Sequence, residues 1–112
     1  MYLGRDFSPQ EITESESFGL DFVNDLDATE ELQSSVWIMT VVDGVDPTPH
    51  KRLEGPSMVV APRDSPNQMK TATIQRIGGL MPDVTYVVRA ECITTLGNTK
   101  SLWTHIRGVD TD

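Results

Sequence analysis

Few residues of this 112-residue chain have the types and spacing that catalysis or metal binding requires. Cys92 is the single cysteine, and because it falls inside an alternating strand pattern we interpret it as a small buried hydrophobe rather than a nucleophile. His50 and His105 are the only histidines, and solvated or partner-facing imidazoles are favoured over a metal pair. No nucleophile elbow, phosphate-binding glycine loop or zinc-type cysteine pair occurs. The sequence therefore predicts a protein that is not an enzyme and has no catalytic residues, cofactor or metal.

A group of acidic residues is the one candidate for a cation site. Asn24, Asp25 and Asp27 are followed by Glu30 and Glu31. The group lacks the 1-3-5 ligand spacing and the central glycine of a calcium loop. A solvated acidic loop is therefore favoured, with weak calcium binding as the alternative.

The charge of the chain limits its partners. The formal net charge is −8, and residues 1–31 hold nine acids against one base, while the remaining residues hold eight of each. Such a chain repels phosphate, so we expect no nucleic acid and no anionic membrane as a partner. A single cysteine permits no intrachain disulfide and fits folding in a reducing cytoplasm. The N-terminus shows no signal-peptide layout, and no segment approaches the ~20 apolar residues of a membrane span.

Alternating apolar and polar residues predict an all-β domain. The stretch 36–42 is β-branched and apolar on both faces, as in a central strand, and we expect its Trp37 to be a core pillar. Residues 45–57 hold three prolines and predict a long loop, and 58–61 predict an edge strand. Further strands are expected around residues 18–22, 70–77, 86–93 and 101–107.

A tyrosine corner specifies the kind of sandwich. Leu80, Pro82 and Tyr86 have the spacing of this motif, and Tyr86 opens an alternating strand. In such a corner the ring lies on the core and the hydroxyl bonds backbone a few residues upstream. We therefore predict an immunoglobulin or fibronectin type III-like sandwich of six to seven strands, with Tyr86, Val88, Ala90 and Cys92 on the core face of the corner strand.

We divide the chain into an N-terminal arm, residues 1–15, and a sandwich domain, residues 16–112. The arm is polar and without clear periodicity, so few apolar anchors offset the cost of ordering it. We expect an acidic, mobile arm that a partner orders.

The last strand carries the candidate interface. Alternation places Leu102, Thr104 and Ile106 on one face and Trp103, His105 and Arg107 on the other. If the first set is core, the second faces outward, and tryptophan and arginine are enriched at interface hot spots. The alternative is a register shifted by one residue, which makes Trp103 part of the core.

The ordered motifs resemble those of a known family, the fibre–tail adaptors of tailed bacteriophages. The resemblance covers roughly residues 5–107, although the leader 5–9 departs from the family pattern and the proline-containing segment 45–57 is longer than in the family. The motifs that carry it are Phe18-Gly19-Leu20-Asp21-Phe22, Ser34-Ser35-Val36-Trp37, Gly78-Gly79, Val84-Thr85-Tyr86-Val87-Val88 and Cys92-Ile93-Thr94-Thr95-Leu96-Gly97.

This resemblance implies an immunoglobulin-like virion protein without enzymatic activity. It implies a place in the viral tail, where the chain joins tail or baseplate parts to fibres through protein–protein contacts. Its partners would be other tail proteins and further copies of itself, assembled after synthesis in the cytoplasm of a bacterial host. The alternative is a fibronectin type III-like binding module of a bacterial surface or secreted protein.

Overall fold

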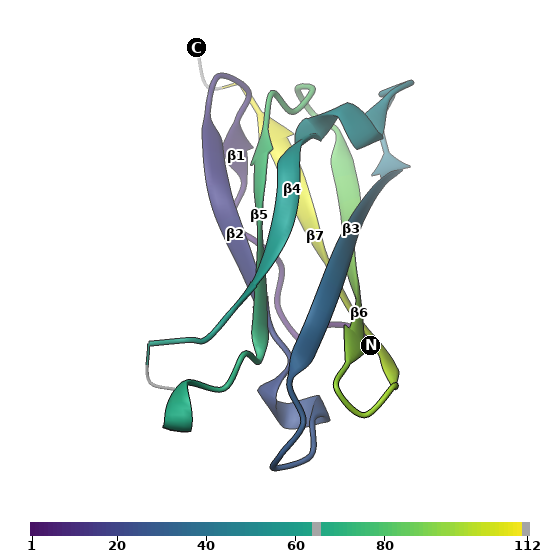
Figure 1. Ribbon diagram of the computed structural model, residues 1–112. Helices are drawn as coiled ribbons and strands as arrows, with labels where there is room; N and C mark the ends of the chain where they lie inside the picture. The colour runs from purple at the N-terminus through teal and green to yellow at the C-terminus, as the bar shows by residue number, and fades with distance from the viewer. Residues whose placement is uncertain (64–65, 111–112) are drawn as a thin grey trace.

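The structure is a computed structural model that describes residues 1–63 and 66–110. These residues form an all-β sandwich, about 46 × 25 × 23 Å (Figure 1). The described strands are β1 (Gln10–Glu11), β2 (Ser15–Asp21), β3 (Leu32–Asp43), β4 (Leu53–Val60), β5 (Ala72–Gly78), β6 (Thr85–Thr94) and β7 (Thr99–Val109). Short 3₁₀ helices lie between them: η1 (Val23–Asp25), η2 (Pro49–Arg52) and η3 (Pro66–Gln68).

The strand order is that of an immunoglobulin-like sandwich. One sheet has the order β1-β7-β6-β3 and the other β2-β5-β4. In a constant-type immunoglobulin domain, strands C, F and G form one sheet and strands A, B, E and D the other. Strands β2 to β7 reproduce the B-to-G arrangement. Only the first strand differs, because β1 pairs in parallel with β7 instead of joining β2. The predicted fold class is confirmed.

The core lies between the two sheets and follows the predicted alternation of β6. Tyr86, Val88, Ala90 and Cys92 are at most 1% exposed. Across the core, β5 contributes polar side chains, and these are hydrogen-bonded as buried polar groups must be. Gln75 Nε2, for example, donates to the carbonyl oxygen of Gly55 at 2.9 Å.

Trp37 is the expected core residue of β3. Its side chain is 5% exposed, and its indole Nε1 donates to Thr73 Oγ1 of the opposite sheet at 3.0 Å. The Thr73 hydroxyl in turn donates to Ser35 Oγ at 2.7 Å. A tryptophan is well suited to this place because its large apolar ring fills the space between sheets while its single donor reaches a partner.

The tyrosine corner is present. The buried Tyr86 hydroxyl accepts a 3.0 Å hydrogen bond from the backbone N–H of Met81. Leu80 is buried, whereas Pro82 is exposed at the tip of the turn. The turn packs so closely on β7 that a Cβ atom on Gly108 would lie 2.2 Å from the Met81 carbonyl oxygen, so only glycine fits there.

The placement of the N-terminus corrects the prediction of a separate arm, residues 1–15. Residues 1–11 lie along the edge of β7 instead. The N–H of Leu3 donates to the Trp103 carbonyl at 2.8 Å and that of Phe7 to the His105 carbonyl at 2.9 Å. The prediction missed this because it weighed the polar composition alone. The edge of β7 supplies backbone partners, and Leu3 and Phe7 pack against the core.

The loop predicted at residues 45–57 is shorter than expected. It contains η2, and β4 already begins at Leu53. The pairing of β4 with β5 is irregular between Glu54 and Met58, and Pro56 lies inside this irregular stretch. Proline is tolerated there because a ladder hydrogen bond is not required of it. The edge position predicted for the strand at 58–61 is confirmed.

Candidate interaction surface

The outward face of β7 carries the three predicted interface residues. Leu102, Thr104 and Ile106 point inward and are at most 5% exposed, so the register predicted for this strand is confirmed. The alternate positions point outward. Trp103 and His105 are half-buried, and Arg107 is exposed.

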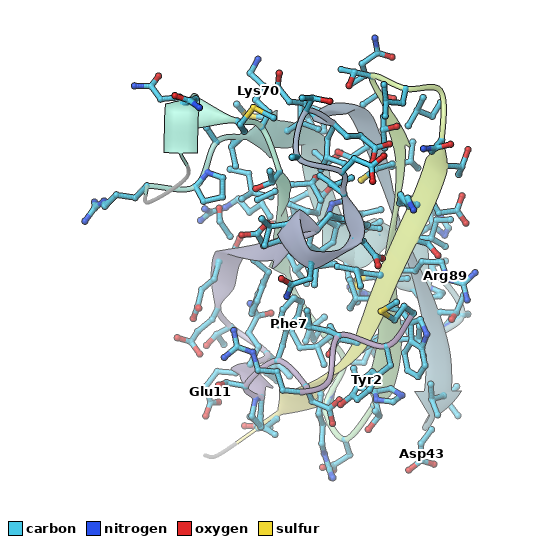
Figure 2. The ribbon with its side chains drawn as sticks, turned by 90° about the horizontal axis from the view of Figure 1, so that it is seen from below. Tyr2, Phe7, Glu11, Asp43, Lys70 and Arg89 are labelled. Carbon is cyan, nitrogen blue, oxygen red and sulfur yellow. The ribbon has the colours of Figure 1, made fainter. Side chains whose placement is uncertain are left out.

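Trp103 and His105 are half-buried because the N-terminus lies over them. The ring of Tyr2 lies 4.8 Å from that of Trp103, centroid to centroid, and the Trp103 and His105 rings meet edge to face at 5.4 Å. Tyr2 lies beside β7 in Figure 2. Aromatic side chains thus gather on the outside of the sheet, where they have no part in the core.

Asp6 joins this cluster through two polar contacts. Its Oδ1 accepts a 2.7 Å hydrogen bond from the Tyr2 hydroxyl and lies 3.2 Å from His105 Nδ1. The hydrogen bond from Tyr2 and the nearby His105 lower the pKa of Asp6, and the same carboxylate raises the pKa of Tyr2. The contacts hold the N-terminal residues onto β7 and orient the aromatic rings.

Arg107 stands apart from the aromatic cluster. Its Nη2 is 3.2 Å from Asp83 Oδ1, and both side chains are mostly exposed. Such an exposed pair contributes little to stability, so the guanidinium stays available to a partner. The structure therefore puts Trp103 and His105 into one cluster and leaves Arg107 beside it.

The same outward face continues across β6 and β3. Ile38 lies opposite Arg89 in the pairing of these strands, and Val36 lies opposite Glu91. These side chains point to solvent, as do the neighbouring Thr40 and Val87. Ile38, Thr40, Val87 and Arg89 together line a shallow depression. This surface is mixed apolar and polar and is suited to contact with another protein.

Sequence reasoning missed a buried polar cluster behind the tyrosine corner. Asp46 is buried and accepts hydrogen bonds from the Tyr86 hydroxyl at 2.8 Å, from Arg52 Nε at 3.0 Å and from the Thr48 N–H at 3.0 Å. Arg52 Nη1 also donates to the Gly79 carbonyl at 2.8 Å. The cluster ties the β3–β4 connection to the corner turn.

The pKa values of this cluster follow from its contacts. The hydrogen bond from Arg52, more than any other contact, lowers the pKa of Asp46 to about 2. Burial is the main cause that raises the pKa of Tyr86 to about 12. The sequence contained a signal for Asp46, because Asp two residues before Thr48 in a proline-containing turn is a common side chain-to-backbone turn motif.

The acidic group at residues 24–31 is only in part the solvated loop that the sequence predicted. Glu30 is 2% exposed, and it accepts hydrogen bonds from Thr94 Oγ1, from Asn98 Nδ2 at 2.9 Å and from the Asp27 N–H at 3.1 Å. These contacts, that with Thr94 foremost, lower its pKa. Glu30 therefore fastens this loop to the β6–β7 turn. Within the described residues, no group of three or more side chains of the metal-binding types comes together.

Cys92 is buried in the core, and burial raises the pKa of its thiol to about 11. Its position matches the predicted small hydrophobe.

Comparisons with protein-family models, with curated proteins and with solved structures give no match for this chain. In the part of the chain that the structure describes, no helix has the length and apolar character needed to cross a membrane.

Proposed function

We propose that this chain is a non-enzymatic structural component of a bacteriophage tail, an adaptor that joins tail or baseplate proteins to fibre proteins. It acts through protein–protein contacts, as one of several copies in the virion, after synthesis in the cytoplasm of the bacterial host. The main support is the ordered set of motifs that resembles the fibre–tail adaptors, carried on an immunoglobulin-like sandwich.

The surface of the sandwich adds a second, independent argument. The aromatic cluster of Tyr2, Trp103 and His105 lies on the outside of the sheet, next to the exposed Arg107. Tryptophan, tyrosine and arginine are the side chains most enriched at the centres of protein interfaces. We assign this β7 surface to the contact with another tail protein.

The alternative function is a fibronectin type III-like binding module of a bacterial surface or secreted protein. The fold suits both functions equally, because sandwiches of this kind serve in many unrelated proteins. The two differ in where the protein resides, and location is therefore the property to measure.

The experiment follows the chain in cells that produce tailed particles. A short epitope is placed after the last residue in the native gene, and lysates are separated on a density gradient. We expect the chain to sediment with intact particles and gold-labelled antibody to mark their tails. Recovery from the cell envelope or as free protein in the medium, with unlabelled particles, would support the binding module and overturn the adaptor.

Trp103→Ala tests the assigned contact in the same experiment. It should change the free energy of unfolding by about 1 kcal/mol or less, because the side chain lies outside the core, yet reduce the amount of chain in the particles. Leu96→Ala, at an exposed site in the β6–β7 turn, is the matched control and should be incorporated normally. Equal incorporation of both variants would remove the β7 surface from the contact.

A further inference from the structure

We propose that the outer face of β3 and β6 is a two-fold self-association surface whose occupant is a second copy of this chain. The inference deepens the proposed tail function, on which it rests for the expectation of an assembly, by naming the surface through which copies meet. It concerns a region of the sheet adjacent to the β7 surface.

The first observation is a stripe of exposed aliphatic side chains along two neighbouring strands. They alternate on β3 and continue on β6, so all of them face the same side of one sheet. Exposed apolar side chains that gather on one face among polar residues mark a site of protein contact. The exposed fractions are 61% for Val36, 39% for Ile38 and 50% for Ile93.

The second observation is a self-complementary pair of charges in the middle of this stripe. Arg89 and Glu91 are two residues apart on β6 and therefore share its outward face. Figure 2 shows the Arg89 side chain projecting away from the sandwich. Its Nη1 is 4.0 Å from Glu91 Oε1, with both side chains about half exposed, so this pair contributes little within one chain.

In a two-fold dimer these two charges would pair between the copies. In a two-fold contact the same surface of both copies is used. If residue i of one copy contacts residue j of the other, then residue j of the first copy also contacts residue i of the second. An axis between Arg89 and Glu91 places each arginine against the glutamate of the second copy. The pair sums to zero charge, so the contact itself adds no like-charge repulsion to that between two chains of net charge −8. The charges of Arg89 and Glu91 balance, so this face has no net negative charge to attract a basic partner protein. This favours a second copy of the chain as the occupant.

The area of the face determines how strongly two copies are expected to associate. Strands of 10 and 12 residues at about 3.3 Å per residue and about 4.8 Å between strands give β3 and β6 a projected face of about 350 Å². Specific interfaces bury roughly 600 Å² or more per partner. The face is smaller than this, so the expected dimer is weak and forms only as the concentration of the chain rises.

Sedimentation equilibrium of the purified chain tests the inference, over about 1 to 300 µM. We expect the mass to rise from 12.4 kDa toward twice that value. Val36→Glu should stay monomeric across the range. Met58→Glu is the matched control, because Met58 is 58% exposed on the outer face of the other sheet, and it should behave as the parent does. Ile93→Glu, on the neighbouring strand, serves as a second variant if Val36→Glu fails to fold.

A crossed charge experiment tests the two-fold geometry itself. Arg89→Glu and Glu91→Arg should each weaken self-association by about tenfold or more, because each variant places like charges against each other. Mixing the two variants should restore association, since each then offers the opposite charges to the other. A parent that stays monomeric, a Met58→Glu variant as weak as Val36→Glu, or a mixture that fails to associate would overturn the inference. None of these results bears on whether the chain sediments with tailed particles, so failure here and failure of the proposed function remain distinguishable.

Discussion

The Tyr86 hydroxyl donates a hydrogen bond to the buried carboxylate of Asp46 while it accepts one from the N–H of Met81. The corner tyrosine thus fastens two loops at once, its own turn and the connection between β3 and β4. Arg52 completes the arrangement by pairing with Asp46 and by donating to the Gly79 carbonyl. A buried carboxylate in this place is tolerated because its charge is paired and its oxygens accept several hydrogen bonds.

Tyr86→Phe should lower the free energy of unfolding by about 1–3 kcal/mol. The substitution keeps the ring but leaves the Met81 N–H without its acceptor and takes one donor from Asp46. Urea unfolding followed by circular dichroism measures the change. Tyr2→Phe is the control, because its hydroxyl contacts Asp6 at the surface, and it should change the midpoint little. Equal midpoints for parent and Tyr86→Phe would show that the corner hydroxyl contributes nothing.

Acid should destabilise the protein through Asp46. Its pKa is about 2 in the folded chain against an ordinary 3.8, so the ionised form is favoured by folding. The stabilisation is fully present above pH 4 and is lost as pH falls through about 2, a contribution of about 2 kcal/mol. Glu30, whose pKa is also lowered, acts in the same direction.

Unfolding at a series of pH values from 5 to about 2 measures this effect. Asp46→Asn should be less stable than the parent at neutral pH and should lose less stability on acidification. The difference between the two proteins should therefore shrink as pH falls. Parallel pH profiles would show that the Asp46 carboxylate does not titrate in this range.

The sandwich could be predicted because its evidence is local in sequence. Alternation along β6 and β7 identifies the faces of each strand, and the spacing from Leu80 to Tyr86 is a motif with a known conformation. Trp37 follows from the same alternation, but the prediction that its strand is central is wrong. β3 lies at the edge of its sheet, and Val36 and Ile38 on its outer face are exposed. Each of these signals is contained within about ten residues.

The candidate surface was only partly predictable, because its contacts join distant parts of the chain. Trp103, His105 and Arg107 were found from alternation, but the coverage of Trp103 and His105 by Tyr2 and Asp6 depends on pairing across about 100 residues. Asp46 likewise acquires its role from Tyr86, forty residues later. A polar composition gives no sign of such long-range contacts, which is why the N-terminus appeared to be a free arm.

Cys92 should be unreactive in the folded protein. The thiol is buried, and its pKa of about 11 leaves almost no thiolate at neutral pH. Labelling with a chromogenic disulfide reagent should be slow in native buffer and rapid in concentrated urea. Rapid labelling without denaturant would contradict the register of β6, since a shift by one residue would expose this side chain.

The N-terminal segment, residues 1–11, should be held on β7 chiefly by Phe7. The Phe7 ring lies 4.8 Å from that of Phe18 on β2, so it closes the gap between the two sheets while its N–H donates to His105. Phe7→Ala should cost about 1–2 kcal/mol, less than a fully buried phenylalanine, because the side chain is only partly buried. The sandwich should remain folded.

Trypsin reports on this segment directly, because Arg5 lies within it. Cleavage after Arg5, followed by mass spectrometry, should be slow in the parent and several-fold faster in Phe7→Ala, since proteolysis requires a locally opened chain. Leu96→Ala, at an exposed position in the β6–β7 turn, should be cut at the parent's rate. If the parent itself is cut after Arg5 as fast as an unstructured peptide, residues 1–11 are the free arm that their polar composition suggested, and Trp103 and His105 are uncovered in solution.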